Sequence, residues 1–148
     1  MLTLDTLNIH FFKKFLLIFW ALWWLIAFWT DIVGGLAHLN LLHASWAPDA
    51  NYPGLKQSLS MYPLYSWIPP ALFICIIAGS LLSSVLFFRA RITYSMQRVD
   101  TAFIFSLIFW LVFFLADQCI MKFDLEENHM VQGGFELLSY LAIRLLPD

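Results

Sequence analysis

The sequence predicts an all-α integral membrane protein, built as a bundle of four transmembrane helices. Of its 148 residues, 61% are hydrophobic and only 12% are charged, whereas about a quarter of the residues in soluble proteins are charged. Four apolar stretches have about the 17–25 residues that a membrane-crossing helix needs. Bases gather at one set of their ends, and acids and histidines gather at the other. We expect residues 1–148 to form a single transmembrane domain.

The first predicted span covers residues 15–33. Its run of apolar side chains is interrupted only near the end, where Asp31 lies. Lys13 and Lys14 come directly before it and are expected to extend toward the membrane interface, because long basic side chains keep their charged heads in water. The glycine pair at 34–35 is expected to end the helix.

The connection at 36–67 is too broken by proline for a span and too aromatic for a solvated linker. Tryptophan and tyrosine favour the headgroup level, since their rings are apolar while their N–H or O–H groups need polar partners. We expect this connection to lie in the interface or to pack on the bundle. Its prolines and main aromatic residues are Pro48, Pro53, Pro63, Trp46, Tyr52, Tyr62, Tyr65 and Trp67.

The second predicted span covers residues 69–88. Pro69 and Pro70 fall in its first turn, where a missing backbone N–H has little cost. Small side chains recur within the span at a spacing that lets another helix approach closely. These predicted helix-packing residues are Ala78, Gly79 and Ser83.

The third and fourth predicted spans differ in how securely they insert. Residues 101–120 begin with a run whose apolar side chains contribute roughly −3 to −7 kcal/mol of insertion free energy, which outweighs Asp117 near the end. Residues 130–146 contribute about −2.4 to −4.8 kcal/mol, against up to roughly 3 kcal/mol each for Glu136 and Arg144. The fourth span therefore requires a partner for Glu136 and an interfacial position for Arg144.

The distribution of charge predicts the topology. Basic residues mark the cytoplasmic side of short membrane segments, so both termini are expected in the cytoplasm. The connection at 36–67 and the acidic turn at 122–128 are expected on the opposite side, in a multi-pass protein of the inner (cytoplasmic) membrane. The net charge of −2 and the absence of a basic run argue against nucleic acid as a partner. The bases on the cytoplasmic side are Lys13, Lys14, Arg89, Arg91, Arg98 and Arg144.

Polar residues recur at three- and four-residue steps along the fourth span and its approach, which places them on one side of a helix. Because exposure of polar groups to lipid is costly, this side should face protein or water. The favoured interpretation is hydrogen bonding across the bundle, and the alternative is a path for protons or substrate. The intramembrane residues of this stripe are Gln132, Glu136, Tyr140 and Arg144, and His129 precedes them.

Acids and histidines at the outer ends suggest a possible metal site. Glu126 and His129 have the Glu-x-x-His spacing that puts both on one helical face, as in di-iron bundles, but the chain lacks the second such motif that a di-iron set requires. Histidine with carboxylate also suits a looser site for zinc, iron, copper or manganese. A solvated acidic cap is the favoured alternative. The candidate metal ligands are Glu126, His129, Asp117, Asp31, His38 and His43.

Three tryptophans lie in the middle of the first span, away from the interface where aromatic belts occur. Mid-span tryptophan favours a protein surface or a flat ligand. We expect these residues to face a larger membrane partner, with a quinone, haem or carotenoid surface as the alternative. They are Trp20, Trp23 and Trp24.

No motif identifies an activity. The favoured function is that of an accessory or structural subunit of a larger inner-membrane complex, of respiratory or transport type, with no catalysis of its own. One alternative is a redox or metal-binding membrane protein, whose metal ion, haem or quinone could be shared with a partner subunit. A second is a small proton-coupled carrier that uses Glu136 and Arg144. The expected partners are the lipid bilayer and other integral membrane subunits.

Overall fold

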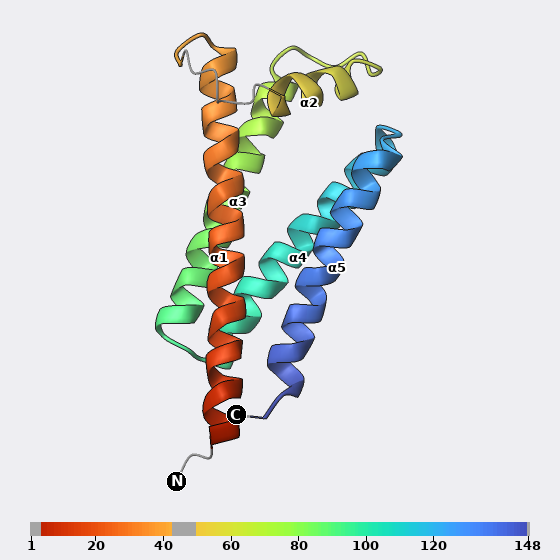
Figure 1. Ribbon diagram of the computed structural model, residues 1–148. Coiled ribbons are helices and arrows are strands. Elements are labelled where there is room, and N and C mark those ends of the chain that lie inside the picture. Colours follow the sequence, from red (N-terminus) through yellow and green to blue (C-terminus); the bar gives the residue numbers. More distant parts are fainter. Residues whose placement is uncertain (1–3, 43–49, 148) are drawn as a thin grey trace. The chain divides into compact units, whose positions relative to one another are not determined.

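The computed structural model describes residues 4–42 and 50–147, which form helices and connecting turns (Figure 1). The predicted metal residue His43 lies outside these ranges. The helices are α1 (Leu4–His38), α2 (Asn51–Leu59), α3 (Ile68–Ile92), α4 (Met96–Cys119) and α5 (Phe123–Leu145).

Three of the described helices are long and apolar enough to cross a membrane: Asn8–His38 within α1, the whole of α3 and the whole of α4. They contain nearly all of the first three predicted spans. The prediction of an all-helical structure with helices able to cross a membrane is therefore confirmed for these three segments. The fourth predicted span lies within α5 except for its last residue, and the acidic first half of α5 makes this helix less apolar.

Helix α1 continues past the glycine pair at 34–35, so the expectation that these glycines end the helix was wrong. The helix ends at His38 because Asn40 adopts a left-handed conformation with φ of 57°. The N–H of Leu41 then donates to the carbonyl of Leu36 at 3.0 Å, which is the hydrogen bond of a Schellman C-cap. The glycine pair at 34–35 forms no such cap, and the helix continues through the apolar residues that follow it.

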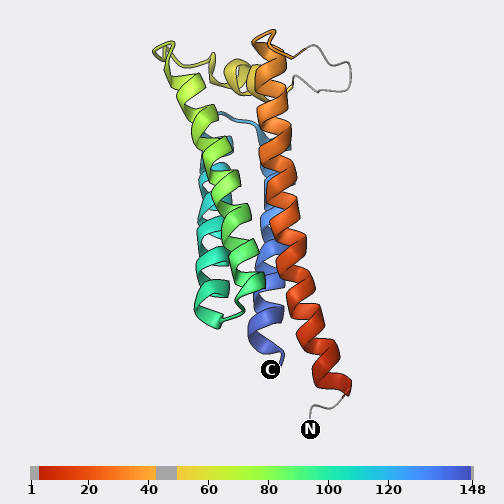
Figure 2. The same ribbon diagram turned by 90° about the vertical axis from the view of Figure 1, so that its left-hand side faces the viewer.

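Helices α4 and α5 form an antiparallel hairpin and lie side by side in both views (Figures 1 and 2). Ser95 caps the start of α4, where its hydroxyl accepts from the N–H of Arg98. At the other end Met121 has a φ of 53°, and the N–H of Lys122 donates to the carbonyl of Asp117 at 3.0 Å. This second Schellman-type turn reverses the chain within a few residues and places α5 directly against α4.

Helix α2 lies within the connection at 36–67, where the sequence predicted no helix. Pro53 was interpreted as a break, but it is the third residue of α2. A proline in the first helical turn removes no intrahelical hydrogen bond. The first bond of α2 instead comes from Gly54, whose N–H donates to the carbonyl of Ala50 at 2.9 Å.

The chain divides into two compact units. The hairpin unit consists of Met1–Trp23 and Ser83–Asp148, and it contains α4 and α5 with the first part of α1 and the end of α3. The connector unit consists of Trp24–Leu82, with the rest of α1, α2 and most of α3.

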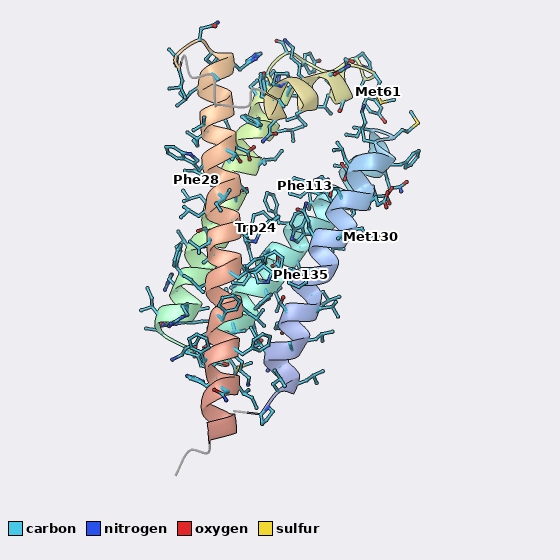
Figure 3. All side chains as sticks on the ribbon, viewed as in Figure 1. Trp24, Phe28, Met61, Phe113, Met130 and Phe135 are labelled. Carbon is cyan, nitrogen blue, oxygen red and sulfur yellow. The ribbon has the colours of Figure 1, made fainter. Side chains whose placement is uncertain are left out.

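Aromatic side chains form much of the core of the hairpin unit. The rings of Phe87 and Phe103 meet nearly at right angles with centroids 4.8 Å apart, and Trp20 packs on Phe135 at 5.6 Å. Edge-to-face contacts of this kind add to the free energy of burial. Exposed apolar side chains such as Met130 lie on the outside of the helices (Figure 3), as expected for contact with lipid.

Lys13 lies inside the hairpin unit instead of extending to the interface. Its side chain is 1% exposed, and its ammonium group donates to the backbone carbonyl of Leu146 at 2.8 Å. Leu146 is the C-cap residue of α5, where unpaired carbonyls favour a nearby cation. Lys14, by contrast, is half-exposed. The expectation of an interfacial lysine was therefore wrong for Lys13, because the end of α5 supplies a polar partner.

The packing face of α3 is displaced from the predicted one. Ser83 is buried, Gly79 is half-buried and Ala78 is exposed. Within the hairpin unit the adjacent Ser84 is also buried, and its hydroxyl donates to the carbonyl of Ala21 on α1 at 2.9 Å. Small polar side chains thus let these two helix segments approach closely, as the spacing predicted for this part of the chain.

Candidate functional site

The polar residues of α5 face α4 at three levels, which together we call the polar seam. At one level His129 meets Asp117. At the middle level Glu136 meets Ser106 and Trp110. At the third level Tyr140 and Arg144 meet Asp100.

Glu136 lies at the centre of the seam and is 0% exposed. The indole N–H of Trp110 donates to its Oε2 at 2.8 Å, and the hydroxyl of Ser106 donates to Oε1. Both donors are themselves buried and belong to α4. Each oxygen of this carboxyl group therefore has a donor from the neighbouring helix, which lowers the cost of placing it among apolar side chains.

His129 and Asp117 form the level nearest the α4–α5 turn. Nδ1 of His129 lies 2.5 Å from Oδ2 of Asp117, and Asp117 is buried. The imidazole also stacks on Phe113, with ring centroids 5.1 Å apart. This packing holds the ring in the orientation that directs Nδ1 at the carboxylate.

Asp100 forms the level at the opposite end. The phenol of Tyr140 donates to its Oδ1 at 3.0 Å, and the guanidinium of Arg144 donates to its Oδ2 at 3.2 Å. Arg144 was expected to extend to the interface. It forms an exposed ion pair with Asp100, and the contribution of such a pair to stability is typically only about 0–1 kcal/mol.

The seam extends along most of α4. Asp100 and Asp117 are seventeen residues apart, which at 1.5 Å per residue corresponds to about 25 Å. The hydrocarbon core of a bilayer is about 30 Å thick. The hairpin therefore has polar contacts near both of its ends and at its middle.

Gly133 allows the two helices to approach at the middle level. A Cβ atom on Gly133 would lie 3.0 Å from Cζ of Phe114 and 3.2 Å from Cβ of Trp110. The adjacent Gly134 has no side chain or neighbouring helix within 4 Å of such an atom. The contact with α4 therefore requires a small residue at position 133 but not at position 134.

We expect Gly133→Leu to lower the free energy of unfolding of the detergent-solubilised protein by about 1–3 kcal/mol, the usual cost of overpacking. The matched control is Gly134→Leu, which adds the same side chain in open space and should change stability by less than about 0.5 kcal/mol. Thermal or denaturant unfolding measures both. Equal effects of the two substitutions would show that close approach at Gly133 is unimportant.

The remaining candidate residues lie outside these pairs. Gln132 is half-buried and has no hydrogen bond with a residue that the structure describes. Among the three tryptophans of α1, Trp20 and Trp24 are buried, so that only Trp23, which is 37% exposed, is accessible to another protein.

The predicted metal ligands are distributed over both units. Glu126 and His129 belong to the hairpin unit with Asp117, whereas Asp31 and His38 belong to the connector unit. Within the described parts of the chain, no three His, Cys, Asp or Glu side chains form a group that could hold a metal ion. The metal site stays a prediction.

Sequence reasoning identified the α5 half of the seam, but of its α4 half it singled out only Asp117, as a candidate metal ligand. Ser106, Trp110 and Asp117 recur at steps of four and seven residues, which keep them on one helical face, and Asp100 precedes Ser106 by six residues. A search of the third span for a face that complements the polar face of the fourth would have found Asp117. It would not have singled out Ser106 and Trp110, because strongly apolar residues surround them.

Comparison of the chain with protein families, with curated proteins and with solved structures gives no match.

Proposed function

We propose that α5 is a fourth transmembrane span, and that both termini of the chain lie in the cytoplasm. Its 23 residues would extend about 34 Å, which is enough to cross a bilayer. The contacts of Glu136 with α4 support this, because insertion of α5 requires a partner for that carboxyl group. The basic residues near the inner ends support the orientation.

Within this topology, the function that we favour is that of an accessory subunit of a larger inner-membrane complex, of respiratory or transport type. The observation that carries the proposal is the pairing within the polar seam. Each acid of the seam is bonded to a side chain of the opposite helix, as in a fixed packing contact. The exposed side chains of the predicted spans are mostly apolar or aromatic, and they include Trp23 and Trp29 of α1.

Gentle purification of the tagged protein from its native membrane tests this proposal. We expect another integral membrane protein to co-purify, and to be lost when Trp23 and Trp29 are both replaced by alanine. The matched control is the double substitution of Leu22 and Ile26 by alanine, which alters other exposed side chains of the same helix. A lone, monodisperse monomer after mild cross-linking in the membrane would contradict the proposal.

A second candidate function, proton coupling, is favoured by the same seam in a different way. Titratable side chains occur at all three of its levels, and a carboxyl group lies at the middle one. Ionisable residues inside a membrane often belong to proton relays. In this function Glu136 would exchange a proton with the pairs on either side of it.

Proton flux into liposomes containing the purified protein separates these two functions. If the seam is a packing contact, an imposed potential should drive no more flux than in protein-free liposomes, and Glu136→Gln should change nothing. If the seam carries protons, flux should exceed that control and fall at least about tenfold in Glu136→Gln, because the amide preserves hydrogen bonding but does not titrate.

A further inference from the structure

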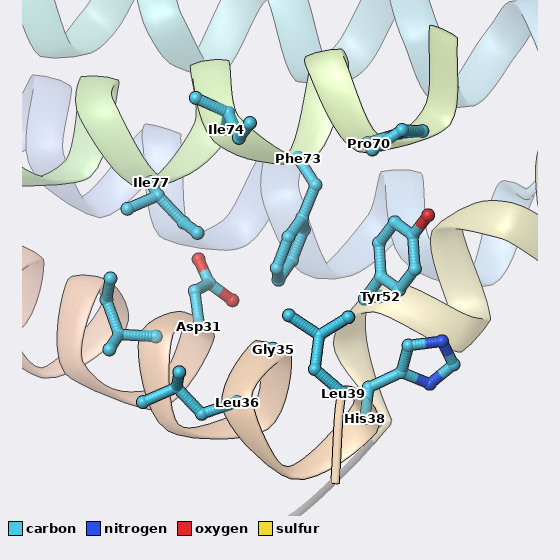
Figure 4. Close-up of a pocket in the computed structure, with 11 residues that line it drawn as sticks. Asp31, Gly35, Leu36, His38, Leu39, Tyr52, Pro70, Phe73, Ile74 and Ile77 are labelled. Atoms are coloured by element: carbon cyan, nitrogen blue, oxygen red, sulfur yellow. The ribbon is translucent and has the colours of Figure 1, made fainter. Parts of the chain in front are cut away.

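The connector unit contains a cavity of about 290 Å³ between the second half of α1, Tyr52 of α2 and the first turns of α3 (Figure 4). Its lining is almost entirely apolar, with Leu36 from α1, Leu39 just after that helix, and Ile74 and Ile77 from α3. Ligand pockets in proteins begin at about 300 Å³. The cavity has room for a small molecule with one ring and a short chain.

Asp31 places a carboxyl group in this apolar cavity. Its side chain is 7% exposed, and Figure 4 shows it pointing inward beside Phe73 and Ile77. The side-chain amide of Asn51 donates to Oδ1 at 2.6 Å. The second oxygen, Oδ2, accepts no hydrogen bond from any residue that the structure describes. One half of the carboxyl group is thus held in place while the other half faces the cavity.

Aromatic rings line the cavity beside this carboxyl group. Phe73 projects from α3 toward Gly35, where a Cβ atom would lie 3.2 Å from its Cε1 atom. Gly35 is four residues after Asp31, so both lie on one face of α1. The ring of Tyr52 lies against Phe73, with centroids 5.2 Å apart, and the ring of His38 covers the other side of Tyr52 at 4.9 Å.

A buried carboxylate beside aromatic faces is an environment that attracts an organic cation. The negative charge pairs with an ammonium group, and the electron-rich ring faces attract the same charge. No described lysine or arginine forms an ion pair with Asp31. A metal ion would require further oxygen or nitrogen ligands, and among the described residues of the lining the only other polar side chains are those of His38 and Tyr52.

We propose that this cavity is a binding site for a small lipophilic amine. The ammonium group donates to Oδ2 of Asp31, and the apolar body of the ligand contacts Leu36, Ile74 and Ile77. Asn51 positions the carboxylate and does not contact the ligand. This site is independent of the polar seam, because all of its residues belong to the connector unit.

The test uses 4-fluorophenethylamine as the probe and ligand-observed fluorine NMR on the protein in lipid nanodiscs. The matched probe is 2-(4-fluorophenyl)ethanol, which has the same ring and chain but no charge. Signals in empty nanodiscs are subtracted, so that partition into lipid does not count as binding. We expect saturable binding of the amine, and at least about tenfold weaker binding of the alcohol, since an unpaired buried charge costs more than 1.4 kcal/mol.

Two variants test separately the contribution of the Asp31 charge and that of the free volume of the cavity. Asp31→Asn keeps the shape of the side chain, and it should weaken amine binding at least about tenfold while leaving alcohol binding unchanged. Ile77→Phe fills the cavity while keeping the carboxyl group of Asp31, and it should remove binding of both probes. Equal affinity of the native protein for the two probes, or full amine binding by Ile77→Phe, would overturn the proposal even if Asp31→Asn failed to fold.

Discussion

Replacing both donors to Glu136, with Ser106→Ala and Trp110→Phe in one protein, should destabilise the hairpin by about 1–4 kcal/mol. Each substitution removes a hydrogen bond to a buried carboxyl group while preserving most of the local packing. Such bonds contribute about 1.5–3 kcal/mol when the group is charged, and about 0.6–2 kcal/mol in membrane proteins. Unfolding in mixed micelles measures the loss.

The same pair of substitutions should cost much less in a Glu136→Leu background. There the carboxyl group is absent, and removing its donors leaves no buried acceptor unsatisfied. The difference between the two costs is the coupling energy of the contact, which we expect to exceed about 1 kcal/mol. Equal costs in the two backgrounds would show that Ser106 and Trp110 do not stabilise the carboxyl group.

The second large effect concerns insertion of α5 by the cellular translocation machinery. A test segment with residues 123–145 alone should insert in about half of the molecules or fewer, because its apolar and charged contributions nearly cancel. The segment 96–145, which adds α4, should insert α5 in most molecules, since α4 supplies Ser106 and Trp110 as partners. Glycosylation sites on either side of α5 report the inserted fraction.

Glu136→Leu provides the matched control for this assay. It removes an unfavourable contribution of about 3 kcal/mol, so that α5 alone should insert almost completely and α4 should no longer matter. If the unmodified α5 inserts equally well with and without α4, the seam does not assist insertion.

The sequence was sufficient to predict the helices that are apolar throughout. The spans at 69–88 and 101–120 lie almost completely within α3 and α4, because a long apolar run in a chain with so few charges has few other structures available. Helix ends were predicted less well. Asn40 and Met121 stop α1 and α4 by adopting positive φ angles. Asparagine adopts such angles more often than most residues, but methionine does not, and neither position was recognised as a helix end.

The α5 half of the seam was evident in the sequence because its polar residues interrupt an apolar stretch. The residues on other helices that contact these polar groups were not evident. Lys13 and Leu146, for example, are 133 residues apart in the chain. The periodicity of one helix does not show which face of another helix packs against it. The cavity around Asp31 was equally hidden, since Tyr52, which lines it, lies in a connection that the sequence showed only as broken and aromatic.

The crossing of the membrane by α5 is the central claim, and cysteine labelling in intact cells tests it most directly. Cys75 and Cys119 are first replaced by serine, because both are exposed. A single cysteine is then introduced as Glu127→Cys or as Leu145→Cys, near the two ends of α5 at exposed positions. We predict that a membrane-impermeant maleimide labels position 127 from outside the cytoplasmic membrane, and labels position 145 only after the membrane is opened. Labelling of both positions from the same side would contradict the fourth span.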